Sequence, residues 1–206
     1  MIVLFSCLLW GYDPNLPHPH RGKLQPLQKS PQAVSLTKEQ KTKLQNKHPV
    51  FLRVKKEDGQ SARGVAVQYI DASVDTVWDT ILNYPRYTDW VDNVTVCSVY
   101  KKNKNIWYTE LISEVMYISF GVYTQNHIFK DKGYMYWVLD YDRLSDADDL
   151  LGYWRVEAIQ KSPPITRVDH STEVMLTGVP DFILEYLSED ALVSGTKWVK
   201  REAERK

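Results

Sequence analysis

The clearest apolar pattern in the sequence has a helical period. Apolar side chains at i, i+3, i+4, i+7 and i+8 fall on one face of a helix: Val74, Val77, Trp78, Ile81 and Leu82. Ser73 can cap this helix, and Asp75 lies in its first turn, where the helix dipole favours an acid. Asn83 can end the helix and Pro85 can open a second short one. We therefore predict that Trp78 packs against a sheet and takes no chemical role.

The chain beyond this segment has β-like runs with little helical period. We expect strands over residues 94–101, 105–115, 116–129, 134–140, 150–159 and 165–177. The gaps between them are too short for crossover helices, which predicts antiparallel pairing. Earlier in the chain, extended runs flank Asp58-Gly59, a dipeptide that tolerates the positive φ values of a tight turn, so they predict a β-hairpin.

Helical patterns also occur on either side of the strand region. Thr37 and Gln40 have the spacing of a capping box, and Pro49 ends the short helix that they begin. A long helix is predicted from Pro180 to about Glu204. Its near-helical stripe consists of Ile183, Leu187, Ala191, Ser194 and Trp198. Residues 12–34 carry five prolines among polar residues, which predicts an extended arm.

Charge and cysteine usage exclude several classes of function. Lys+Arg and Asp+Glu both number 26, and this zero net charge argues against a nucleic-acid partner. Cys7 and Cys97 make no disulfide framework, and no Cys/His cluster has the spacing of a zinc site. The acidic run at residues 140–149 lacks the register of an EF-hand. We expect no metal and no cofactor; the oligomeric state stays open.

The first eleven residues, MIVLFSCLLWG, are apolar but shorter than a membrane span requires. One interpretation is an export segment or a lipid-anchor region around Cys7. The protein would then be exported or associated with a membrane, and the membrane contact would be either anchored or transient. The other is an apolar tail that packs on the domain of a cytoplasmic protein. The sequence does not decide between them.

Several stretches resemble a known superfamily. The segments DASVDTVWDTILNYPRYTDWVDNV, YMYWVLDYD, GYWRV and TGVPDFI are similar to the START-like (helix-grip) superfamily, and within it to the polyketide cyclase/dehydrase and coenzyme Q-binding START-domain group. The resemblance implies an α+β helix-grip fold: a curved antiparallel sheet wraps around a long C-terminal helix, and two short helices follow the first long strand. It also implies an apolar ligand held between sheet and helix. We accordingly divide the chain into an N-terminal apolar segment and arm (1–34), a short helix (35–49) and a START-like ligand-binding domain (50–206).

Strand parity predicts which side chains would line such a cavity. Along 165–177, Val168, His170 and Thr172 share the inward face. The opposite face, which we expect to be solvated, carries Arg167, Asp169, Ser171 and Glu173. Together with inward residues of other strands, the long helix and the helix–strand junction, the candidate ligand-binding set is Tyr87, Trp90, Met116, Phe120, Trp154, Val168, His170, Thr172, Ile183 and Leu187.

Three functions are compatible with this lining. The first is binding or transport of a hydrophobic small molecule such as a lipid, an isoprenoid quinone or a sterol-like compound. The second is a polyketide cyclase/aromatase-type enzyme in which His170 or an inward tyrosine acts as acid or base. The third is a structural or regulatory domain that binds a partner through the same groove. The lack of convergent ionisable residues favours the first, in which His170 is a core-edge histidine bonded to a hydroxyl or carbonyl.

Overall fold

The strands form one antiparallel sheet in the computed structural model, which describes residues 11–25, 27, 30–55, 62–115, 118–177 and 189–205. Within these ranges the sheet has eight strands in the order β1-β2-β8-β7-β6-β5-β4-β3. Their bounds are β1 Val50–Lys55, β2 Ala62–Ile70, β3 Val94–Asn103, β4 Ile106–Val115, β5 Ile118–Phe129, β6 Tyr134–Leu139, β7 Asp149–Lys161 and β8 Pro164–Met175. The antiparallel pairing expected from the short connections is confirmed.

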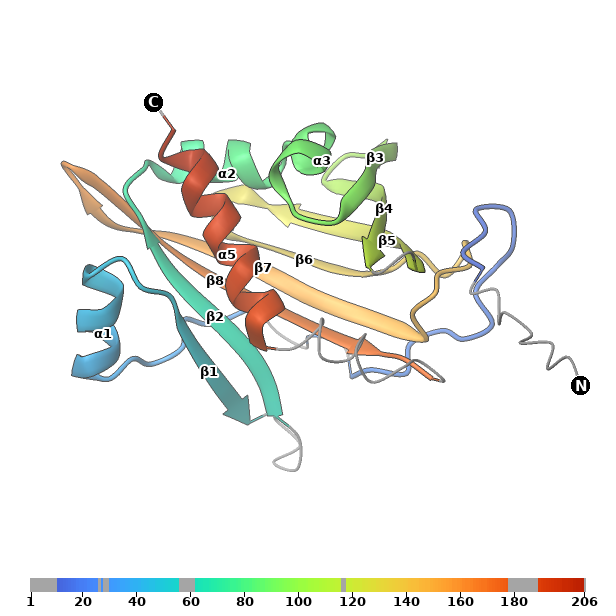
Figure 1. Ribbon diagram of the computed structural model, residues 1–206, viewed down its shortest axis with the longest axis horizontal. Helices are drawn as coiled ribbons and strands as arrows, with labels where there is room; N and C mark the ends of the chain where they lie inside the picture. The colour runs from blue at the N-terminus through green and yellow to red at the C-terminus, as the bar shows by residue number, and fades with distance from the viewer. Residues whose placement is uncertain are drawn as a thin grey trace, which may run out of the picture.

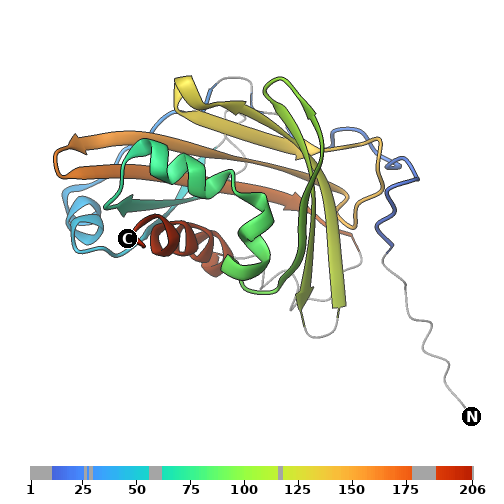
Figure 2. The same ribbon diagram turned by 90° about the horizontal axis from the view of Figure 1, so that it is seen from above.

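The helices gather mainly on one face of this sheet. Their bounds are α1 Lys38–Gln45, α2 Val74–Ile81, α3 Tyr87–Trp90 and α5 Glu189–Ala203, with short 3₁₀ turns η1 Tyr84–Arg86 and η2 Lys130–Lys132. α5 crosses the sheet in front of β2, β7 and β8 (Figure 1). Figure 2 shows α2, α3 and α5 together on the concave side, with β3 and β4 turned steeply relative to β7 and β8. The strong twist closes this side around the helices.

The helix α2 forms as its periodicity predicts. The Ser73 hydroxyl caps it by accepting from the Thr76 backbone N–H at 3.1 Å. Val77, Trp78 and Ile81 are fully buried in the main core, which also contains residues of β2, β8 and α5. Trp78 is therefore a packing residue, as expected.

The N-terminal arm and α1 cover part of the opposite face of the sheet. The predicted capping box is present, since Thr37 and Gln40 each accept a backbone N–H from the other. Leu44 of α1 packs in a second core with Val50, Val65 and Val67 of β1 and β2. This second core seals a face that the helices α2 and α5 do not reach.

The prediction that the outward residues of β8 are solvated is wrong. Arg167, Asp169 and Ser171 are buried, and Asp169 has no exposed surface. The Arg167 guanidinium donates to Asp169 at 2.6 and 3.0 Å and to the Val34 carbonyl at 2.9 Å. The arm lies over these side chains, and their polar groups are satisfied by one another and by backbone instead of by water.

Some predicted features fall outside the described residues. They include the segment 1–10, the Asp58-Gly59 turn, Met116 and the expected first turns of the last helix with Ile183 and Leu187. The strands that flank the turn do pair as a hairpin, with Lys55 opposite Ala62. In the described part of the chain, no helix is long and apolar enough to cross a membrane.

Candidate functional site

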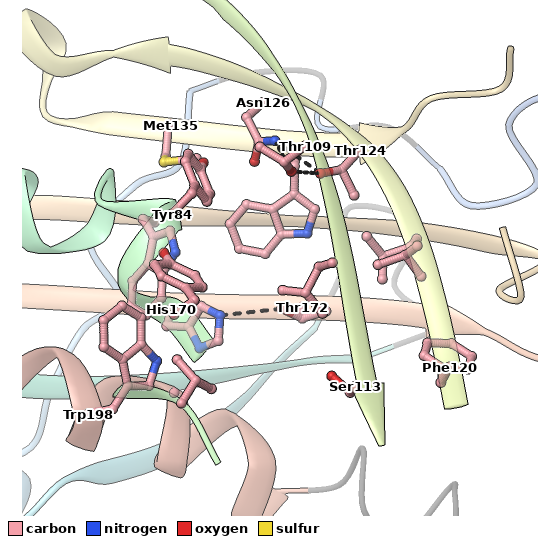
Figure 3. A pocket seen from close by; sticks show the side chains of 18 of the residues that line it. Tyr84, Thr109, Ser113, Phe120, Thr124, Asn126, Met135, His170, Thr172 and Trp198 are labelled. Atoms are coloured by element: carbon pink, nitrogen blue, oxygen red, sulfur yellow. Dashed lines mark hydrogen bonds between the residues drawn. The ribbon is translucent and has the colours of Figure 1, made fainter. Parts of the chain in front are cut away.

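A cavity of about 290 Å³ lies between the concave face of the sheet and the helices η1, α3 and α5. Figure 3 shows side chains from both layers pointing into it. Its lining is Tyr84, Tyr87, Val91, Thr109, Leu111, Ser113, Ile118, Phe120, Val122, Thr124, Asn126, Met135, Trp137, Leu150, Trp154, His170, Thr172, Gly195 and Trp198. Ligand sites of small-molecule binding proteins have this character, with many apolar and aromatic groups and few polar ones.

The inward residues of the strands follow from alternation along each strand. Phe120, Val122, Thr124 and Asn126 occupy every second position of β5 and all face the cavity. Alternation along β4 likewise places its glutamates on the face of the sheet that points away from the cavity. Glu110 binds Tyr123 and Ser98 away from the cavity, and no carboxylate occurs in the described lining.

His170 lies at the contact between the sheet and α5. Its ring stacks on Trp154 with centroids 3.9 Å apart. Nδ1 lies 3.3 Å from the Leu192 carbonyl and Nε2 lies 3.4 Å from the Thr172 hydroxyl. A carbonyl only accepts, so Nδ1 carries the hydrogen and Nε2 accepts from Thr172. Burial lowers the pKa of His170 to about 4, against a smaller opposing effect of the Leu192 carbonyl. The ring is neutral near pH 7 and both nitrogens are engaged.

Gly195 allows α5 to approach this histidine. A Cβ at this position would lie 2.8 Å from Cε1 and 2.9 Å from Nδ1 of His170, closer than side chains pack. The helix can therefore rest directly on the imidazole only because residue 195 has no side chain.

Tyr87 and Trp198 form the wall beneath α3. Their rings meet edge to face with centroids 4.8 Å apart, and the Tyr87 hydroxyl donates to the Ile81 carbonyl at 2.5 Å. Burial, with smaller contributions from Tyr84 and Cys97, raises the pKa of Tyr87 well above its ordinary value. Tyr87 is thus a protonated, bonded wall residue.

A small polar cluster interrupts the apolar lining where β4 meets β5. The hydroxyls of Thr109 and Thr124 lie 2.8 Å apart, and Asn126 Nδ2 donates to each at 3.0 Å. Figure 3 shows this cluster at the end of the cavity away from Ser113 and Phe120.

The structure brings five of the ten candidate ligand-binding residues together around the cavity. These are Tyr87, Phe120, Trp154, His170 and Thr172. Val168 is completely buried in the main core, with Trp78 and Trp154, and does not line the cavity. Trp90 lies beyond Trp198, lining a neighbouring hollow of about 360 Å³ with Lys197 and Arg201. α3 ends at Trp90 after a single turn, and the Trp90 ring stacks on Trp198 with centroids 6.3 Å apart.

Several lining residues were absent from the candidate set. Asn126 and Thr124 share the parity of Phe120, so alternation was a signal that could have found them. For Trp137, alternation alone does not tell which side is inward, because the adjacent Tyr136 is also aromatic. The structure places Tyr136 on the outer face of the sheet, where its ring stacks on the His127 ring with centroids 4.5 Å apart, and Trp137 on the cavity side.

In the described ranges, no three His, Cys, Asp or Glu side chains are grouped to hold a metal ion.

The sequence matches the family model for polyketide cyclase/dehydrase and lipid transport over residues 70–192, more than half of the 206-residue chain. The chain belongs to this family. The resemblance seen in the sequence is therefore confirmed, and the sheet wrapped around α5 is the helix-grip fold that it implied. A search of curated protein sequences gives no match.

Solved structures share the fold at low sequence identity. The Zhui aromatase/cyclase from Streptomyces sp. R1128 is 13% identical with a TM-score of 0.59, over 77% of this chain and 95% of the cyclase. The STAR-related lipid transfer protein from Xanthomonas axonopodis is 13% identical with a TM-score of 0.57, over 75% of this chain and 99% of that one. Human StAR-related lipid transfer protein 5 is 8% identical with a TM-score of 0.53, over 76% of this chain and 82% of the human protein. These likenesses show the fold, and both cyclases and lipid transfer proteins adopt it.

Proposed function

We propose that this protein binds or carries a hydrophobic small molecule, such as a lipid, an isoprenoid quinone or a sterol-like compound, in the cavity beneath α5. The observation that carries the proposal is an apolar cavity of about 290 Å³ in a domain of ordinary size. Apolar side chains that border empty space lose packing contacts, because the surrounding structure relaxes only partly into it. An apolar occupant restores these contacts.

Some of the relatives support this function, and others support the cyclase alternative. The family description includes lipid transport, and two of the structural neighbours are named lipid transfer proteins. The cyclase alternative requires an acid or base at the ligand. His170 and the tyrosines Tyr84 and Tyr87 are the candidates in the described lining. A pKa lowered to about 4 makes His170 a weak base, with both nitrogens already bonded. Burial raises the pKa of both Tyr84 and Tyr87 well above the ordinary value, which makes both phenols weak acids. We therefore favour binding over catalysis.

Solvent extraction of the purified protein tests this function. We expect mass spectrometry to find an apolar compound that co-purifies with wild type, because such a compound fills the void. Ser113→Trp places an indole in the cavity and should carry much less of it. Glu114→Trp is the matched control, since residue 114 is exposed one position further along β4. Equal amounts in all three proteins, or none in wild type, would remove the support for a carrier.

A further inference from the structure

Five exposed lysines gather at two neighbouring turns of the sheet. We call them the lysine edge: Lys101, Lys102 and Lys104 of the β3–β4 hairpin, and Lys130 and Lys132 of η2. A hydrogen bond joins the two turns, since the Ile128 N–H donates to the Asn105 carbonyl at 2.8 Å. Figure 2 shows both turns on the same side of the molecule, away from α5. The five ammonium groups therefore belong to one edge of the protein.

Most of this charge has no counter-charge within the described part of the chain. Lys130 alone among the five forms ion pairs with described residues, at 3.6 Å with Asp75 and 3.3 Å with Asp79. Asp131 adds one carboxylate to η2. Five lysines against three carboxylates leave a surplus of two positive charges, on a chain whose net charge is zero. The acidic residues 140–149 follow the opposite end of β6, so the two signs of charge are separated along the strands.

Three lysines of the edge lie over aromatic rings. The distances from Nζ to the ring centre are 4.5 Å for Lys101 over Tyr108, 3.6 Å for Lys102 over Trp107 and 5.4 Å for Lys132 over Phe129. The three rings are half-buried. A ring attracts an ammonium group without neutralising it, so each of these lysines keeps its charge and its donors for an anion.

Protection of the sheet edge explains only part of this pattern. β3 is the last strand of the sheet, and lysines on such a strand discourage pairing with another sheet. Lys132, however, lies in η2 and outside any strand. The surplus charge therefore extends beyond the strand that needs this protection.

The combination of lysines and half-buried aromatics fits a membrane surface better than a nucleic acid. Tyr and Trp rings are enriched at the headgroup level of bilayers, and lysine stems extend along apolar surface while the ammonium stays in water. Single-stranded nucleic acids instead stack their bases on open aromatic faces. Lysines lie over the faces of Tyr108 and Trp107, and the Phe129 ring stacks on Tyr134 with centroids 5.0 Å apart.

We propose that the lysine edge docks the protein on a membrane surface that carries anionic lipids. The ammonium groups contact the phosphates and carboxylates of the headgroups, and the polar edges of Trp107 and Tyr108 lie at the same level. The contact is electrostatic and reversible, because it uses a few lysines on turns and no inserted helix. This inference goes beyond the proposed function, since it assigns a membrane-facing surface and does not depend on what the cavity holds.

Sedimentation of the full chain with lipid vesicles tests this docking surface. Wild type should sediment with phosphatidylcholine vesicles that contain about a quarter phosphatidylserine, and not with phosphatidylcholine alone. Salt at about 0.5 M should release it, because the ions screen the charges. Lys104→Gln combined with Lys132→Gln should weaken binding to the anionic vesicles roughly tenfold or more.

A second pair of lysines provides the matched control. Lys38→Gln combined with Lys41→Gln changes the net charge equally on α1, which packs on β1 and β2 at the other edge of the sheet. This variant should bind anionic vesicles like wild type. All four lysines are exposed and form no ion pair with described residues, so both double variants should unfold within a few degrees of the wild-type Tm.

Three outcomes would overturn the docking surface. The first is equal sedimentation with neutral and anionic vesicles, and the second is wild-type binding by the folded Lys104→Gln, Lys132→Gln variant. The third is comparable affinity for a single-stranded RNA that the same variant loses, which would make the edge a nucleic-acid site. A cavity that holds no apolar compound would sink the proposed function and leave the vesicle results unchanged, so the two failures are distinguishable.

Discussion

Replacing Arg167 by methionine should destabilise the protein by about 3–5 kcal/mol, because it leaves the carboxylate of Asp169 buried without its main partner. Asp169 has no exposed surface and accepts two bonds from Arg167. The other described cation close to it, Arg155, approaches only to 3.9 Å. The same substitution also frees the Val34 carbonyl, which holds the arm against β8. Urea unfolding at neutral pH measures the loss.

Two variants give this prediction its controls. Arg21→Met breaks the exposed pair with Asp142, in which both side chains are more than two thirds exposed, and should cost less than about 1 kcal/mol. Arg167→Met combined with Asp169→Leu removes both charges and should recover most of the lost stability. If Arg167→Met costs no more than Arg21→Met, the arm does not exclude water from this pair.

Acidification should weaken the fold through His170 by about 3 kcal/mol between pH 7 and pH 4. Burial lowers its pKa to about 4 in the folded protein, whereas an unfolded histidine titrates near pH 6.5. As the pH falls through this window, the unfolded chain binds the proton first. The contribution of His170 is therefore complete above about pH 6.5 and is lost progressively toward pH 4.

Comparison with His170→Gln isolates this effect. Glutamine cannot titrate, and its amide can still donate to the Leu192 carbonyl. Burial raises the pKa of Asp146 and Asp169, which acts in the opposite direction, but these carboxyls are present in both proteins and cancel in the difference. Urea unfolding from pH 7 to 4.5 should show wild type losing more stability than the variant. Parallel pH profiles would contradict a buried, neutral His170.

Periodicity predicted the parts of the fold that depend on local sequence. The apolar face of α2, the capping box of α1 and the inward set of β8 each follow from residues within one element. The length of the connections was enough to predict antiparallel pairing. None of these features needs information from a distant part of the chain.

Contacts between distant segments set the limit of the sequence analysis. Alternation along β8 separates Arg167 from Val168, but it does not reveal that residue 34, 133 positions earlier, covers the outer face. Similarly, Tyr84 lines the cavity beside Tyr87 because of how η1 packs against β3, which no local pattern encodes.

The central claim is that the space under α5 is a binding cavity for an apolar molecule, and fluorescence titration with N-phenyl-1-naphthylamine tests it most directly. Wild type should bind one equivalent saturably, with the increase in fluorescence typical of an apolar environment. Ser113→Trp should weaken binding roughly tenfold or more because the indole occupies the cavity, whereas Glu114→Trp should bind like wild type. Absence of saturable binding to wild type, or equal binding by both folded variants, would contradict the account.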